Sequence, residues 1–327
     1  MKMNQTLIGK VALVAGATRG AGRGIACMLG EAGATVYCSG RSTRGNPSPM
    51  QRAETIDETA ELVTARGGRG IAVCTDHTNA DDVGRLIARI EKEQGRLDIV
   101  VNDLWGGGEQ PQYGKRFWQI PPERGLAMLQ NAIASHVLTS HRAIPLLLRG
   151  ERGLIVDITD GDGFPYRGHF YYDLAKTTEI RMAFALAADL RRTNVTALAL
   201  SPGFLRSEVV LEILGVTEEN WRDGISKRRE FVESETPYFV GRAVAALAAD
   251  PHVKRKAGRV YNSAALAREY GFRDVDGRQP DIWKYFAEEM PRLGYRSADD
   301  GFYAYWTTGF DALEEELAAL DELRASS

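Results

Sequence analysis

Short apolar runs alternate with longer amphipathic stretches between residues 10 and 262. Such alternation is typical of repeated strand-helix-strand units, in which helices cover a parallel sheet. The amphipathic stretches show helical spacing. Val83, Leu86, Ile87 and Ile90, for example, are apolar at positions i, i+3, i+4 and i+7. The seven predicted strands are residues 11–15, 35–38, 70–74, 99–101, 154–158, 195–200 and 259–261.

Near-continuous apolar strands between helices predict a doubly wound α/β fold of the Rossmann type, with a seven-stranded parallel sheet and helices on both faces. Two longer helices are expected at residues 123–148 and 171–192. Residues 7–266 fit one domain. Residues 267–327 are expected to be an extension packed on that domain, with an acidic amphipathic helix near residues 312–324. Because ligands of this architecture bind beyond the carboxyl ends of the strands, functional residues are expected just after each strand.

The composition is that of an ordinary globular protein, 44% hydrophobic and 26% charged over 327 residues. The formal net charge of −3 provides no positive field, so neither nucleic acid nor an anionic membrane is an expected partner. No apolar run approaches the roughly 18 residues of a membrane span. The three cysteines have no CxxC spacing. We therefore expect a cytoplasmic protein without a metal site or a disulfide framework.

A glycine-rich turn joins the first predicted strand to the helical pattern after it. Gly16, Gly20 and Gly22 leave room for a tight turn, and Thr18 and Arg19 lie inside it. Backbone amides at the start of such a helix can bind a pyrophosphate, because they are unpaired donors at the positive end of the helix dipole. The pattern alone also fits a plain turn. Its place between a strand and a helix predicts a dinucleotide site.

The end of the second strand indicates which dinucleotide binds. An NAD site needs an acidic residue about 20 positions after the glycine turn, and none occurs between Glu31 and Glu54. Arg41 follows the strand instead, and Arg19 lies in the glycine turn. Two guanidinium groups could bind a 2′-phosphate through bidentate hydrogen bonds. NADP(H) is therefore the predicted cofactor. The alternative, two solvated surface arginines, leaves the missing acid unexplained.

Two more polar residues follow strands. Asp76 comes after the third strand, where it could meet the adenine, and Asn102 follows the fourth. Both residue types are also common in ordinary turns. Their position at the expected ligand edge makes both of them predicted cofactor-binding residues.

A tyrosine and a lysine stand at the start of the long helix after the fifth strand. The separation of four residues places Tyr172 and Lys176 one turn apart on the same helix face. This spacing alone is commonplace. After the fifth strand of a dinucleotide-binding fold, however, it lies at the rim where a nicotinamide is expected.

Taken together, these features resemble the short-chain dehydrogenase/reductase family over residues 7–266. The resemblance is carried by Gly16, Gly20 and Gly22, by Asp76, by Val101-Asn102, by Tyr172 and Lys176, and by Ser201-Pro202-Gly203. Residues 158–162 and 267–272 resemble the dehydrogenase/reductase member 1 subgroup.

The resemblance implies roles for these residues. Tyr172 is the expected acid/base at the substrate oxygen, and Lys176 lowers its pKa and holds the nicotinamide ribose. A tyrosine pKa near 10 would have to fall by up to about three units for efficient catalysis near pH 7, and a neighbouring ammonium favours the phenolate. Pro202 and Gly203 are expected to shape the wall beside the nicotinamide. A homodimer or homotetramer through the two long helices is also expected by resemblance.

Two positions depart from the family pattern. The serine usual after the fifth strand is replaced by Thr159 or Asp160, which motif and spacing leave as alternatives. A threonine hydroxyl can polarise a carbonyl, whereas an ionised aspartate repels a developing oxyanion and helps only when protonated. The asparagine of the family's proton relay falls on Ala132, with Asn131 adjacent. One residue rotates a helical side chain by about 100 degrees, which puts the relay in doubt.

The predicted function is an NADP(H)-dependent oxidoreductase that transfers a hydride to or from a carbonyl or secondary alcohol. An apolar or aromatic small-molecule substrate is expected, because aromatic residues gather in the segments expected to border the site. These residues are Trp105, Tyr113, Phe117, Trp118, Phe164, Tyr166, His169 and Phe170. The alternative is a dinucleotide-binding or sensing protein that has lost turnover. An isomerase on the same fold is a third reading.

Overall fold

The structure, a computed structural model, describes residues 5–48, 52–105, 115–162 and 166–290. Seven parallel strands form one sheet in the order β3-β2-β1-β4-β5-β6-β7. The strands are β1 (Val11–Ala15), β2 (Thr35–Gly40), β3 (Arg69–Cys74), β4 (Ile99–Asn102), β5 (Gly153–Ile158), β6 (Val195–Ser201) and β7 (Val260–Asn262). The predicted doubly wound parallel sheet is confirmed, and all seven predicted strands are present.

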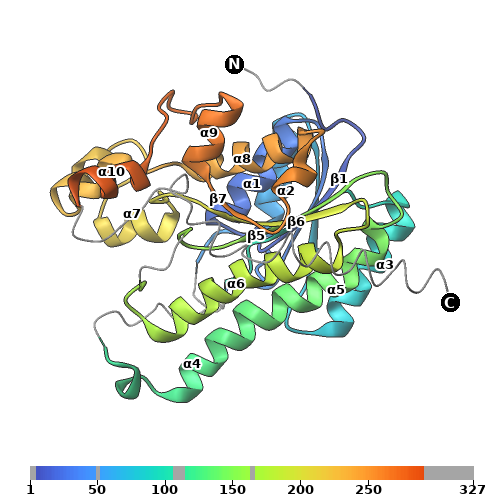
Figure 1. The fold of residues 1–327 in the computed structure, drawn as a ribbon, viewed down its shortest axis with the longest axis horizontal. Coiled ribbons are helices and arrows are strands. Elements are labelled where there is room, and N and C mark those ends of the chain that lie inside the picture. The colour runs from blue at the N-terminus through green and yellow to red at the C-terminus, as the bar shows by residue number, and fades with distance from the viewer. Residues whose placement is uncertain (1–4, 49–51, 106–114, 163–165, 291–327) are drawn as a thin grey trace, which may run out of the picture.

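Helices cover both faces of this sheet (Figure 1). The helices are α1 (Gly20–Glu31), α2 (Ile56–Ala65), α3 (Ala80–Gln94), α4 (Pro122–Leu129), α5 (Ser135–Leu147), α6 (Phe170–Asp189), α7 (Glu208–Leu214), α8 (Pro237–Ala249), α9 (Ser263–Tyr270) and α10 (Ile282–Glu289). Helices α1, α2 and α8 pack on one face, and α3, α5 and α6 pack on the other.

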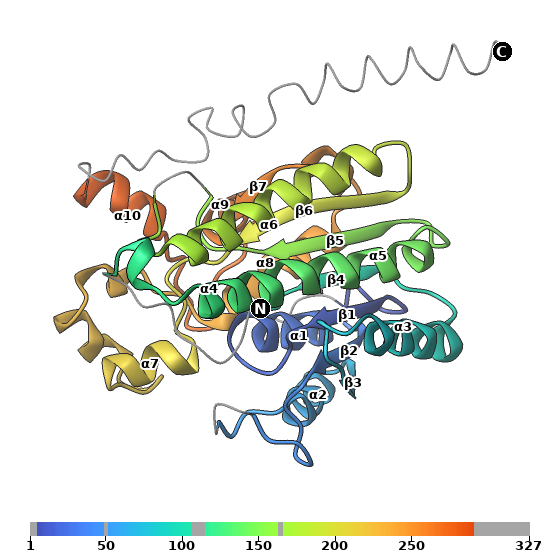
Figure 2. The same ribbon diagram turned by 90° about the horizontal axis from the view of Figure 1, so that it is seen from below.

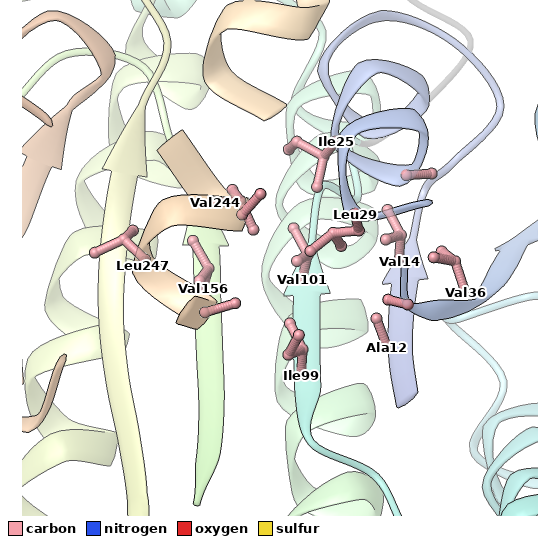
Figure 3. Close-up of a cluster of buried hydrophobic side chains, with 14 of the residues drawn as sticks. Ala12, Val14, Ile25, Leu29, Val36, Ile99, Val101, Val156, Val244 and Leu247 are labelled. Carbon is pink, nitrogen blue, oxygen red and sulfur yellow. The ribbon is translucent and has the colours of Figure 1, made fainter. Parts of the chain in front are cut away.

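The strand residues alternate between the two hydrophobic cores. Ala12 and Val14 point to the core under α1, α2 and α8, which Figure 3 shows, while Val11 and Leu13 point to the core under α3 and α5. Successive strand side chains face opposite ways, so a strand buried on both faces has to be apolar throughout. This explains why the strands are short continuous apolar runs.

The predicted helix over residues 123–148 is interrupted. Between α4 and α5 the chain forms a π-helical turn, Gln130–Ala134. A π turn inserts an extra residue and changes which side chains face inward, and such turns often occur at functional sites. Helices α4 and α6 lie side by side in both views (Figures 1 and 2). The π turn therefore lies beside the helix that carries Tyr172.

The described part of the predicted extension packs on the sheet domain. Trp283 of α10 packs with Phe204 and Ala264. The fully buried Arg206 forms ion pairs with Glu218 (2.9 Å) and Asp276 (3.0 Å). The predicted helix near residues 312–324 lies outside the described residues, and the predicted limit between residues 266 and 267 falls within α9.

The described residues show neither a membrane-spanning helix nor a metal-binding cluster. In that part of the chain, no helix combines the length and the apolar character needed to span a membrane. The same residues contain no group of three His, Cys, Asp or Glu side chains placed to hold a metal ion.

Candidate active site

The glycine turn is held against the ends of two neighbouring strands. The Gly16 and Ala17 amides donate to the carbonyl oxygen of Ser39 (2.9 and 3.0 Å). Gly16 has φ +92, and a Cβ there would lie 2.1 Å from the backbone oxygen of Asp103. A Cβ on Gly22 would lie 2.4 Å from the Gly16 oxygen. The motif thus needs glycine because backbone passes close to backbone on both sides of the turn.

A carboxyl group lies beneath this turn. The Gly22 amide donates to Oδ2 of Asp103 (2.5 Å). Burial raises the pKa of Asp103 to about 7, because a desolvated carboxylate is disfavoured. Asp103 directly follows Asn102 at the end of β4. Its place after a strand can be seen in the sequence, but its contact with the glycine turn cannot.

A second carboxylate lies at the start of α1. The Gly20 amide donates to Oε2 of Glu208 (2.9 Å), which belongs to the first turn of α7. This amide lies where the sequence predicts a pyrophosphate contact. Thr18 is buried beside the end of β2, where a Cβ on Gly40 would lie 2.9 Å from its Oγ1. Sequence reasoning missed Glu208 because it lies 188 positions from Gly20.

The two predicted arginines have different surroundings in the structure. Arg41 is exposed just beyond β2. The Nη2 atom of Arg19 donates to Oγ of Ser48 (3.2 Å), and its Nε atom lies 3.6 Å from Oε2 of Glu54. Glu54 is the residue that ends the acid-free stretch, and Arg52 also binds it (2.9 Å). The cationic groups at this edge are therefore partly paired with carboxylates.

Arg52 connects this edge to α7. Its Nη1 and Nη2 atoms donate to the two carboxylate oxygens of Glu212 at 2.7 and 2.8 Å. The Arg52 side chain is only 12% exposed. Two carboxylates of α7, on Glu208 and Glu212, thus contact the predicted cofactor-binding edge. Arg52 was not among the predicted residues.

The other two predicted cofactor residues differ in their surroundings. Oδ1 of Asp76 accepts hydrogen bonds from the amide (2.9 Å) and hydroxyl (2.7 Å) of Thr78, as in an ordinary turn. Asn102 is fully buried, and its Nδ2 donates to Ser140 (3.0 Å) and Asp157 (2.9 Å). The Asn102 side chain therefore ties β4 to β5 and α5 and is directed into the interior.

The structure places Asp160, not Thr159, at the predicted catalytic tyrosine. The Tyr172 hydroxyl donates to Oδ2 of Asp160 (2.5 Å). The Thr159 hydroxyl donates to the backbone oxygen of Lys176 (2.7 Å) and the residue is 2% exposed. His169 caps α6, because its side chain accepts from the Tyr172 amide (3.2 Å). Thr159 thus supports the helix, and the Asp160 carboxylate is the group that meets Tyr172.

Lys176 has a carboxylate partner of its own. Its Nζ lies 3.1 and 3.0 Å from the two oxygens of Glu179, which is fully buried. Burial raises the pKa of Glu179. Nζ also lies 5.1 Å from the ring centroid of Trp105, which packs edge-on against Tyr172 at 5.0 Å. Glu179 is three residues after Lys176 on the same helix, a spacing from which the contact was predictable.

A buried histidine lies behind this pair. His136 and Asp157 are fully buried, and Nδ1 of His136 lies 3.0 Å from Oδ1 of Asp157. Burial alone would lower the pKa of His136, but the hydrogen bond and charge of Asp157 raise it. Ala132 of the π turn is buried, and the backbone oxygen of Asn131 accepts from the Ser135 hydroxyl. This backbone contact of Asn131 does not test the family's proton relay, which the sequence puts in doubt.

Glu235, a buried acid, packs behind Gly203 in the wall that the sequence predicts beside the nicotinamide. A Cβ on Gly203, which follows Pro202, would lie 2.7 Å from Oε2 of Glu235. That oxygen accepts from the Ser263 hydroxyl (2.5 Å). Burial raises the pKa of Glu235 to about 8. Glycine at position 203 thus allows Glu235 to support the turn after β6.

Aromatic side chains lie where the substrate was expected. Phe117 packs on Phe170 and Tyr171, with ring centroids 4.4 and 5.7 Å apart. Phe117, Trp118, Tyr166 and Phe170 are exposed. Tyr113 and Phe164 lie outside the described residues. The exposed rings of Phe117 and Phe170 thus form an apolar cluster with Tyr171, the residue before Tyr172.

The sheet order and the glycine turn between β1 and α1 define a Rossmann-type fold. Residues 10–214 match the family model described as short chain dehydrogenase. The chain belongs to the short-chain dehydrogenase family, whose members use nicotinamide dinucleotide cofactors.

Curated relatives and solved structures agree with this assignment. The chain is 34% identical over 292 residues to dehydrogenase/reductase SDR family member 1 of Mus musculus, with 88% of each chain covered. The human protein of that name is 34% identical over 275 residues, covering 83% of this chain and 84% of that protein. A crystal structure of a short-chain dehydrogenase/reductase from Burkholderia xenovorans matches with TM-score 0.64 and 25% identity, over 79% of this chain and 95% of that one.

Proposed function

We propose that the protein is an NADP(H)-dependent oxidoreductase that transfers a hydride to or from a carbonyl or secondary alcohol carbon. The observation that carries this proposal is the Tyr172 hydroxyl on the same face of α6 as the buried Lys176, beside the open end of β5. A relative whose name states an activity, the 7alpha-hydroxysteroid dehydrogenase of Clostridium sardiniense, is 27% identical to this chain over 207 residues.

The residues of the turn fit a dinucleotide. Gly16 and Gly22 allow the backbone of the turn to pack tightly against itself and against Asp103, and α1 begins there with Gly20. Arg41 and Arg19 are the proposed ligands of a 2′-phosphate. Thr18 and Asp76 are proposed to contribute to the rest of the site. When bound, the cofactor supplies or accepts the hydride.

The chain's own residues handle the proton. In the reductive direction, Tyr172 donates its hydroxyl proton to the substrate oxygen as negative charge develops there. The Lys176 ammonium stabilises the phenolate that remains, and it is held by Glu179 and Trp105. An Asp160 carboxylate would oppose charge on the substrate oxygen, so it assists this step only in its protonated form.

The proposal is tested first by fluorescence titration with NADPH and NADH. NADPH should bind more tightly, and Arg41→Ala should remove most of the difference, because the 2′-phosphate loses a bidentate partner. Equal affinities for the two cofactors in the unmodified protein would contradict the NADP(H) assignment.

Turnover is then measured as NADPH consumption with a panel of ketones and aldehydes. Tyr172→Phe should abolish turnover while leaving NADPH affinity within about twofold, since it removes only the proton donor. Tyr270→Phe is the matched control, because Tyr270 lies at the end of α9 and its hydroxyl donates to Asp250 (2.6 Å), so this variant should leave turnover unchanged. Tight binding without turnover on any carbonyl would favour the sensing protein, a reading that Asp160 beside Tyr172 motivates.

A further inference from the structure

The side chain that meets the Tyr172 hydroxyl is a carboxylate, where the family pattern has a neutral serine hydroxyl. The Tyr172 hydroxyl and Oδ2 of Asp160 are 2.5 Å apart. A substrate atom that takes a hydrogen bond from Tyr172 therefore lies within reach of this carboxylate. Thr159 is committed to the backbone of α6. Asp160 thus determines which charge the site accepts at the reacting atom.

Asp160 is an exposed residue, and its carboxylate accepts the Tyr172 hydroxyl. The neighbouring cations have other carboxylate partners. The Lys176 ammonium lies between both oxygens of Glu179, and the Arg167 guanidinium pairs with Asp173 at 2.9 Å. Arg167 also donates to the backbone oxygen of Asp160. The rim of the site therefore has negative charge available for a ligand.

A carboxylate at this position affects two substrates in opposite ways. For a ketone, negative charge develops on the oxygen during reduction, and a nearby carboxylate raises the barrier. For an iminium ion, the C=N group is already positive and loses that charge on reduction, so the carboxylate stabilises the bound substrate. Aromatic faces such as that of Trp105, which already packs against the Lys176 ammonium, also suit cations.

We propose that the site binds and reduces cationic C=N compounds, with Asp160 as the specificity-determining residue for the positive charge. This rests on the proposed hydride transfer. The hydride adds to the iminium carbon, one C–H bond forms, and the π pair of C=N becomes the nitrogen lone pair. The co-reactant NADPH is oxidised to NADP⁺. A fully substituted nitrogen takes up no proton in this step, so Tyr172 is not required as an acid.

The test compares N-methyl-3,4-dihydroisoquinolinium with the neutral ketone 1-tetralone, with NADPH as reductant. The iminium should have a kcat/KM at least about tenfold higher, and Asp160→Asn should lower that value about tenfold while raising the kcat/KM of the ketone, whose developing negative charge the carboxylate opposes. Tyr172→Phe should abolish ketone reduction and leave iminium reduction largely intact. A preference for the ketone, or an equal loss of both activities in Asp160→Asn, would overturn the proposal.

A binding measurement keeps the two proposals separate. Calorimetry of the cofactor-free protein with N,N-dimethyl-tetrahydroisoquinolinium, a permanent cation, should show a Kd about tenfold higher in Asp160→Asn. Glu219→Gln removes the same charge from an exposed position and should leave the Kd unchanged. Equal cation affinity in unmodified protein and Asp160→Asn refutes the charge site even if NADPH turnover is found. If the unmodified protein binds the cation through Asp160 but oxidises NADPH with none of the substrates, only the proposed hydride transfer is refuted.

Discussion

The contact between Glu208 and the start of α1 leads to a quantitative prediction about cofactor affinity. The Gly20 amide donates to Glu208 at 2.9 Å, and we expect the pyrophosphate to need the donors at this helix terminus. If the two compete, replacing the carboxylate by the neutral amide in Glu208→Gln should tighten binding of both NADPH and NADH. The two cofactors share the pyrophosphate, so the effect should be similar for both.

The magnitude follows from the hydrogen bond and from charge repulsion. A hydrogen bond to a charged acceptor contributes about 1.5–3 kcal/mol and a neutral one about half as much. Like charges about 4 Å apart repel by about 1 kcal/mol in water. Together these terms give about 1.8–2.5 kcal/mol, which corresponds to a Kd roughly 20 to 70 times lower. The repulsive part should shrink in high salt, because mobile ions screen it.

The assay is a fluorescence titration at low and high salt, with Glu219→Gln as a control for the change in net charge. The thermal midpoint of the cofactor-free protein should fall slightly in Glu208→Gln, because a carboxylate at a helix N-terminus stabilises the helix dipole. Tighter binding together with a lower midpoint is the expected pair of results. An unchanged or higher Kd would show that Glu208 and the pyrophosphate do not compete, and the reasoning would fail.

Two predictions concern stability. The pKa of Glu235 is raised to about 8 in the folded protein from 4.5, so folding should become less favourable by up to about 1.4 kcal/mol per pH unit as pH rises through that interval. Denaturant unfolding at pH 5 and pH 8 should show a smaller loss in Glu235→Gln than in the unmodified protein, the remainder arising from groups such as Asp103, whose pKa of about 7 lies in the same interval; parallel profiles would contradict the assignment to Glu235. Gly24→Ala should destabilise the fold by about 1–3 kcal/mol, because its Cβ would lie 2.0 Å from the Pro237 oxygen. Gly84→Ala, in a helix with nothing within 4 Å, should raise the thermal midpoint instead, and equal shifts in the two variants would refute the packing argument.

The hydrophobic pattern predicts the strands well because burial on both faces requires apolar residues throughout. Strand ends are less accurate. Strand β2 continues to Gly40, which pairs with Cys74 of β3, and backbone pairing of this kind leaves no hydrophobic signal. The π turn was also not predictable, since residues 130–134 contain neither proline nor glycine.

In the candidate site, residues with local contacts could be predicted from the sequence, and residues whose contacts depend on the tertiary fold could not. Motif residues such as Gly16 and Tyr172 were predictable, because their spacing reflects a local turn or one helix face. Glu208 was not, because its contact depends on how α7 folds back over the glycine turn. The choice between Thr159 and Asp160 was equally inaccessible, since it depends on which side chain turns toward Lys176.

The charges around Tyr172 also bear on its acidity. The field of the Lys176 ammonium favours the phenolate, but Glu179 lies 3.0 Å from that ammonium and offsets part of its field. A charged Asp160 at 2.5 Å opposes the phenolate directly. Both carboxylates therefore offset part of the positive field at Tyr172, unlike a site with a lone lysine and a serine. A ketone is reduced against this negative charge, whereas an iminium ion pairs with Asp160 and needs no proton from Tyr172.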